Sequence, residues 1–157
     1  MSTVKRAYFY RFYPTNEQKH MLARTFGCVR YTYNWALRLS IDTYQATGKG
    51  LSYKELSAQL TLLKHQEDTT FLHEVSCVPL EPRLRHLKRA SVNFFEGRAR
   101  YPTFKKRRGS QSAEYTRSAF TWEDGTLTPG PDGRTSCDCL VASSSCWGAA
   151  FHRHGTS

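Results

Sequence analysis

Apolar side chains recur at helical spacing through the first half of the chain. Thr15 and Gln18 form a capping box, in which each side chain bonds the other residue's backbone, and an apolar stripe then continues until Gly48. Gly27 lies inside this stripe and offers a break. The pattern therefore predicts either two helices joined near Gly27 or one bent helix, and leaves both open.

Two further helices are predicted downstream. Ser52 and Glu55 form a second capping box, and apolar residues at helical spacing predict a helix from residue 53 to about 65. After a polar loop, Pro82 fits a first helical turn, and the pattern continues to Gly97. One face of this last helix is cationic and carries Arg83, Arg85, Lys88 and Arg89.

Strands are predicted at the start of the chain and after residue 110. Residues 4–13 are rich in aromatic side chains with cations between them, which is typical of a β-strand. Residues 113–115 and 119–123 resemble short strands, and Asp124-Gly125 predicts a tight hairpin. From Thr128 the composition turns to Pro, Gly, Ser, Thr and Cys without periodicity, which predicts a disordered tail.

Charge is distributed unevenly along the 157 residues. The chain has 23 Lys and Arg against 13 Asp and Glu, a net charge of +10, and residues 1–109 carry all of this excess. No apolar run approaches the roughly 20 residues of a membrane helix, and Arg11 interrupts the apolar N-terminal stretch, so neither a membrane span nor a signal peptide is expected. We therefore expect a cytoplasmic protein. Because its five cysteines are an odd number and no secretory signal is expected, we expect them to be free thiols.

The segment from Arg98 to Arg108 is the most concentrated charge in the sequence. It contains six cations, two aromatic residues and no acid. Spaced cations neutralise phosphates, and exposed aromatic rings stack on bases, so the segment predicts contact with nucleic acid. A solvated linker is the alternative. The predicted binding residues are Lys88 on the preceding helix and Arg98, Arg100, Tyr101, Phe104, Lys105, Lys106, Arg107 and Arg108.

The cations of the N-terminal strand are also candidates. Lys5, Arg6 and Arg11 alternate with aromatic residues, as on a strand with one buried face and one that contacts nucleic acid. Ordinary exposed cations on a barrel strand would give the same pattern, and the sequence does not separate the two.

The sequence indicates neither a metal site nor a catalytic site. Cys137, Cys139, Cys146, His152 and His154 are zinc-ligand types, but they form no Cys-x-x-Cys pair and lie in a Ser/Gly-rich tail. No nucleophile and base, phosphate-binding glycine loop or pair of carboxylates stands out. We therefore predict no cofactor, no metal site, no small-molecule substrate and no enzymatic activity of the chain itself.

Several segments in one order resemble a known family. They are RFYPTNEQ, TFGCVRYTYNWAL, GKGLSYKELS, NFFEGRARYPTFKKRRG and AFTWEDGTL, within residues 4 to about 127. This order is similar to the N-terminal region of the TnpB/OrfB proteins of insertion sequences, long called transposases. The resemblance implies an RNA-guided DNA endonuclease whose helical recognition insert interrupts a small wedge-like β-barrel, before a RuvC-like nuclease domain.

The resemblance also implies a domain plan and partners. It implies an α+β fold, in which residues 1–14 and 98–127 give an incomplete barrel and residues 15–97 are the helical helix-turn-helix and recognition insert. Tyr53, residues 76–81 and Thr116 match regions that face the DNA motif flanking the target. The expected partners are DNA and guide-type RNA, in a prokaryotic cytoplasm at the nucleoid.

The resemblance ends near Leu127. Residues 128–157 match nothing in the family, and the family's acidic metal-binding residues are absent from the sequence. We therefore predict a fragment truncated before the nuclease domain, with a tail translated out of frame; translation of the other two frames after codon 127 tests this. The alternatives are a standalone helix-turn-helix regulator of the element and a relic without function.

Overall fold

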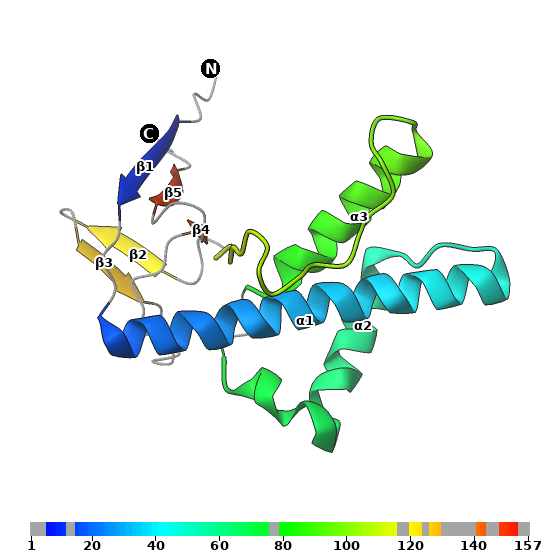
Figure 1. Cartoon of the computed structure of the whole chain (residues 1–157), viewed down its shortest axis with the longest axis horizontal. Helices are drawn as coiled ribbons and strands as arrows, with labels where there is room; N and C mark the ends of the chain where they lie inside the picture. Colours follow the sequence, from blue (N-terminus) through cyan, green and yellow to red (C-terminus); the bar gives the residue numbers. More distant parts are fainter. Residues whose placement is uncertain are drawn as a thin grey trace.

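The computed structural model describes the backbone of residues 6–11, 15–75, 79–115, 120–123, 126–129, 141–143 and 148–153, and the side chains of residues 15–75 and 79–115. Helices α1 (Asn16–Thr47), α2 (Tyr53–Lys64) and α3 (Glu81–Phe95), with the 3₁₀ helix η1 (Glu67–His73), make up the largest part. Figure 1 shows α1 as one long helix, from which α3 runs obliquely to one side and α2 steeply to the other. None of the described helices is both long and apolar enough for a membrane span.

Helix α1 begins and ends where its sequence predicts. Thr15 caps the first turn in a reciprocal capping box with Gln18, whose side chain accepts a hydrogen bond of 2.8 Å from the Thr15 backbone. At the other end Gly48 adopts a φ of 68°, a left-handed conformation that glycine reaches without steric cost. Between these ends the helix is continuous through Gly27, so the two-helix alternative is wrong for this segment.

Helices α2 and α3 close the bundle against α1. The capping box at Ser52 and Glu55 starts α2 as predicted, and Pro82 occupies the first turn of α3. The stretch after α2, which reads as a polar loop, contains the short 3₁₀ helix η1. Its Leu72 is buried, so η1 adds to the core although no helical period marks it.

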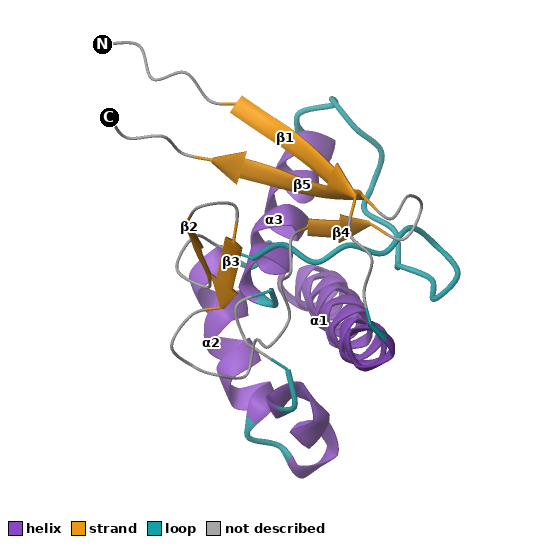
Figure 2. Cartoon of the chain, turned by 90° about the vertical axis from the view of Figure 1, so that its left-hand side faces the viewer, coloured by secondary structure: helices purple, strands orange, loops and turns teal. Residues whose placement is uncertain are grey.

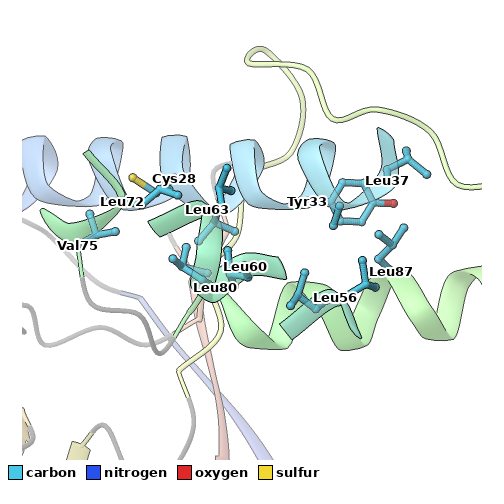
Figure 3. Packing of buried hydrophobic residues seen from close by; sticks show 14 residues of the cluster. Cys28, Tyr33, Leu37, Leu56, Leu60, Leu63, Leu72, Val75, Leu80 and Leu87 are labelled. Carbon is cyan, nitrogen blue, oxygen red and sulfur yellow. The ribbon is translucent and has the colours of Figure 1, made fainter. Parts of the chain in front are cut away.

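The core lies where these four helices meet. Figure 3 shows Tyr33 and Leu37 of α1, Leu56 of α2 and Leu87 of α3 facing one another, with Leu60, Leu63, Leu72, Val75 and Leu80 continuing the cluster toward Cys28. Ala113 joins the cluster from the chain beyond α3, although residues 113–115 form no strand. Burial raises the pKa of the Cys28 thiol, which keeps this cysteine in its neutral form.

The described strands form two small sheets. β1 (Arg6–Arg11) pairs antiparallel with β5 (Gly148–Arg153), which also pairs with β4 (Val141–Ser143). β2 (Phe120–Glu123) and β3 (Thr126–Pro129) form a separate antiparallel hairpin, as the Asp124-Gly125 pattern predicts. Figures 1 and 2 show these sheets beside the N-terminal end of α1.

The predicted α+β fold with an incomplete small β-barrel is therefore wrong. The buried core is helical, and β1 pairs with β5 and not with the β2–β3 hairpin, so the described strands share no barrel wall. The sequence of a strand does not specify a distant partner, which explains the error. The predicted disordered tail also differs from the structure, which places β4 and β5 within residues 128–157. That residues 128–157 arise from a frameshift stays a prediction.

Gly27 and Gly48 give a matched pair of substitutions. A Cβ at Gly27 would meet no atom within 4 Å, so Gly27→Ala should stabilise α1 by about 0.5–1 kcal/mol through lower backbone entropy in the unfolded chain. Gly48 is equally open but has a φ of 68°, so Gly48→Ala should destabilise the fold. Urea unfolding followed by circular dichroism measures both. Stabilisation by both substitutions would contradict the left-handed cap.

The start of α2 predicts a dependence of stability on pH. Hydrogen bonds from Ser52 hold the pKa of the Glu55 carboxyl below its ordinary value near 4.5, and the Ser52 backbone N–H donates one of them at 2.7 Å. A carboxylate with a lowered pKa stabilises the fold fully above its unfolded pKa, and loses this effect as the pH falls through the folded value. Glu55→Gln, which keeps a neutral acceptor, should lower the melting temperature at about pH 7 and have a smaller effect at about pH 3. An equal effect at both values would show that the carboxylate charge contributes nothing.

Candidate nucleic-acid interface

The cationic segment 98–108, called the basic segment below, is fixed to the helices. Gly97 has a φ of 72° and turns the chain at the end of α3, after which the chain runs back along α3 and α1 (Figure 1). The Asn34 side chain of α1 binds the backbone of Lys105 on both sides, accepting from its N–H at 2.7 Å and donating to its carbonyl at 3.0 Å. Pro102 is buried. The basic segment is therefore held in a defined path, unlike a solvated linker.

Two arginines on the helices fix the chain directly after the basic segment. Arg30 of α1 donates to the Gln111 side chain at 3.3 Å. Arg83 of α3 donates to the Ser112 hydroxyl at 2.7 Å and also to the Ser112 carbonyl. Burial lowers the pKa of Arg83, and the nearby charge of Glu114 opposes this shift. These bonds, with the buried Ala113, anchor the end of the path.

Most cations of the basic segment keep their charged ends available. Lys105 places Nζ 5.4 Å from the centre of the Tyr33 ring, and Arg98 forms an ion pair of 2.9 Å with Glu96. Within the part of the chain whose side chains are described, four others are exposed and make no side-chain hydrogen bond or ion pair: Arg100, Lys106, Arg107 and Arg108. Fixed backbone with free charged ends suits recognition of a polyanion.

The two aromatic residues of the basic segment differ in how their rings pack against the helices. Tyr101 is 43% exposed and meets Phe94 of α3 edge to face, with ring centres 4.9 Å apart. Phe94 in turn contacts Phe95, and Phe95 contacts Tyr44 of α1. Phe104 is 47% exposed. Both rings can offer a face to a base, and Tyr101 does so from a packed support.

Tyr53 and Lys88 lie at a different place, where α2 begins beside α3. Arg85 of α3 lies over the Tyr53 ring, 5.3 Å from its centre. Lys88 donates to the Leu51 carbonyl at 3.0 Å, so its ammonium group holds the loop before α2. The structure thus places both predicted residues where α2 begins beside α3, and it gives Lys88 a structural contact.

The remaining predicted residues fall where side chains are not described. Lys5 and Thr116 lie outside the described residues, and Arg6 and Arg11 lie at the two ends of β1. For residues 76–81, only 79–81 are described, and Glu81 at the start of α3 is exposed. Among the described side chains no three His, Cys, Asp or Glu residues are close enough to hold a metal ion.

Arg30, Asn34 and Arg83 are the residues that the sequence prediction missed. Arg83 had a signal: it precedes Leu87 by four positions, which places it at the buried edge of α3 and not on its exposed cationic face. Arg30 and Asn34 had none, because their partners lie 81 and 71 positions away.

Comparison with known proteins gives one family model and several curated relatives. Residues 1–49, which contain β1 and α1, match the family model of the OrfB/IS605 helix-turn-helix domain. A “Putative RNA-guided DNA endonuclease” of Streptomyces pristinaespiralis is 54% identical over 129 residues, which are 82% of this chain and 32% of the relative. The “Putative RNA-guided DNA endonuclease InsQ” of Escherichia coli K12 is 30% identical over 110 residues, which are 70% of this chain and 27% of the relative. A third relative, “Virulence protein VsdF” of Salmonella dublin, is 30% identical over 106 residues, which are 62% of this chain and 89% of that protein.

These matches define an insertion-sequence protein of the OrfB type. The chain belongs to the TnpB/OrfB family, as its ordered sequence segments predict. It spans about a third of the length of the first two relatives.

Proposed function

We propose that this chain binds nucleic acid through the basic segment, with guide-type RNA and DNA as its partners. The observation that carries the proposal is the double hydrogen bond between Asn34 and the Lys105 backbone, since it fixes a run of cations while leaving their charged ends exposed. A fixed segment has lost most of its conformational entropy on folding, so little more is lost when a phosphate chain binds.

The relatives support RNA and DNA as partners, because two of them carry the name of an RNA-guided DNA endonuclease. Phosphate contacts hold a nucleic acid in place without reading its sequence, whereas Tyr101 and Phe104 can stack on bases of a single strand. We therefore expect structured RNA with unpaired bases to bind at least as tightly as duplex DNA. The proposal concerns binding; that the chain itself cuts no DNA, and that it acts in a prokaryotic cytoplasm at the nucleoid, stay predictions.

A gel-shift series with structured RNA, single-stranded DNA and duplex DNA at rising salt tests the proposal. If the six cations each neutralise one phosphate, the logarithm of the association constant should fall against the logarithm of salt with a slope of about −4 to −5. A slope near zero would contradict the proposal. Tight binding to one duplex sequence without RNA binding would instead support a regulator that reads duplex DNA, although the uninterrupted α1 contains no turn between two helices.

A further inference from the structure

A pocket lies between α1, the first turn of α3 and the chain around residues 105–112. Its volume is about 150 Å³, roughly ten times what a single water needs. Val29 and Tyr33 of α1 contribute apolar wall, and the stretch 110–112 contributes hydroxyl and amide groups. The remaining wall is cationic, since Arg30, Arg83, Lys105 and Lys106 all line the pocket.

Among the described residues that line this pocket, none is an acid that could balance the four cations. The charge of Glu114 acts on Arg83 from outside the pocket lining. The Glu114 carboxylate itself contacts the His86 ring at 2.8 Å. Four like charges around a small space repel one another, and the half-buried position of Arg30 and Arg83 reduces the screening of this repulsion by water. A bound anion would remove the repulsion.

Arg83 gives a second, independent indication. Its terminal nitrogen Nη2 donates to Ser112. Its Nε is buried and has no hydrogen-bond partner among the described atoms. A buried guanidinium donor without a partner is unfavourable. Arginine also binds phosphate oxygens through two nitrogens at once, which no other side chain does. The arrangement is that of a site completed by a ligand with several acceptor oxygens.

We propose that Arg30, Arg83, Lys105 and Lys106 form a binding site for one phosphate group. This proposal rests on the proposed function, since it makes the pocket the point at which a nucleic acid bound to the basic segment inserts a phosphate. Two of the four cations come from the helices, so the pocket would fix the position of the nucleic acid relative to the bundle, which the exposed cations alone cannot do. The phosphate is either an internal phosphodiester or a terminal monophosphate.

Two variants and one matched control test the site. Arg30→Gln removes one pocket charge and keeps a neutral side chain, while Arg83→Lys keeps the charge but removes the planar fork. Arg38→Gln is the control: Arg38 also lies on α1, its side chain is 70% exposed, and it pairs with Asp42 away from the pocket. Circular dichroism establishes whether each variant folds. If Arg83→Lys does not fold, Arg30→Gln alone is enough to test the site.

The first measurement uses inorganic phosphate. Phosphate at millimolar concentration should raise the melting temperature of the wild type and of Arg38→Gln above that in sodium chloride of equal ionic strength, because a ligand that binds only the folded state stabilises it. The rise should be lost in Arg30→Gln. Equal rises in all three proteins, or no rise in the wild type, would overturn the site.

The second measurement uses a short RNA with either a 5′-phosphate or a 5′-hydroxyl. Arg30→Gln should weaken binding about tenfold at about 0.1 M salt, and Arg38→Gln should not. Loss of binding restricted to the 5′-phosphorylated RNA would identify a terminal phosphate, and equal loss for both RNAs an internal one. If the wild type binds RNA and both Arg30→Gln and Arg38→Gln bind it equally well, the pocket proposal fails and the proposed function stands. If inorganic phosphate acts as expected but no nucleic acid binds, the proposed function fails and the phosphate site stands.

Discussion

Glutamine at all four positions 105–108 should lower the affinity for structured RNA about 100-fold at about 0.1 M salt, and should reduce the salt slope by about 3. Each lost cation ends the release of one condensed counterion, and this release drives the association. The path of the segment should survive, because Asn34 binds the backbone of Lys105 and not its side chain. Fluorescence anisotropy with a labelled RNA, at several salt concentrations, measures both quantities.

The control for this variant removes the same charge elsewhere. Lys19, Arg24, Arg38 and Lys49 are exposed and lie on or just after α1, and Arg24 and Arg38 are already paired with acids. Glutamine at these four positions changes the net charge equally and should alter the slope far less. If both variants lose affinity alike, binding depends on net charge alone, and the basic segment has no special role.

The second large effect concerns the core. Leu84 of α3 is fully buried in the cluster between the helices, so Leu84→Ala removes apolar contacts and leaves a cavity. We expect a loss of about 2–5 kcal/mol in the free energy of unfolding. This corresponds to a fall in melting temperature of roughly 5–20 °C. Urea unfolding followed by circular dichroism measures it.

Leu62 of α2 provides the same chemical change on the surface. Its side chain is 59% exposed, so Leu62→Ala should alter the free energy of unfolding by no more than about 0.5 kcal/mol. Similar losses for the two substitutions would mean that α3 does not pack against α1 and α2 as described.

Local signals in the sequence predict the ends of the helices well. The capping boxes at Thr15 and Ser52 start α1 and α2 where expected, and Gly48 ends α1. Gly27 misleads because one glycine costs a helix only about 1 kcal/mol, and the apolar stripe continues in phase on both sides of it. Packing of that stripe against α3 outweighs the cost.

Pairings between distant residues are what the sequence pattern could not supply. The strand pattern of residues 6–11 is correct, but nothing in it indicates β5 as its partner, and so the expected barrel was wrong. The basic segment is predicted as a place of nucleic-acid contact, a function not yet tested. Its anchors at Asn34 and Arg30 leave no pattern, because a hydrogen bond between remote positions requires no periodicity. Arg83 has a local signal, its position four residues before the buried Leu87.

The anchors also determine when the proposed binding surface forms. Asn34 and Lys105 are 71 positions apart, and Arg30 and Gln111 are 81 apart, so each bond closes a long loop. Closing such loops costs chain entropy, and contacts between remote residues are favoured only once the local helices exist. The basic segment should therefore join the helices late in folding and leave them first during partial opening. The cationic surface then exists only on chains that have completed the bundle, and a nucleic acid held by it would slow the first step of unfolding.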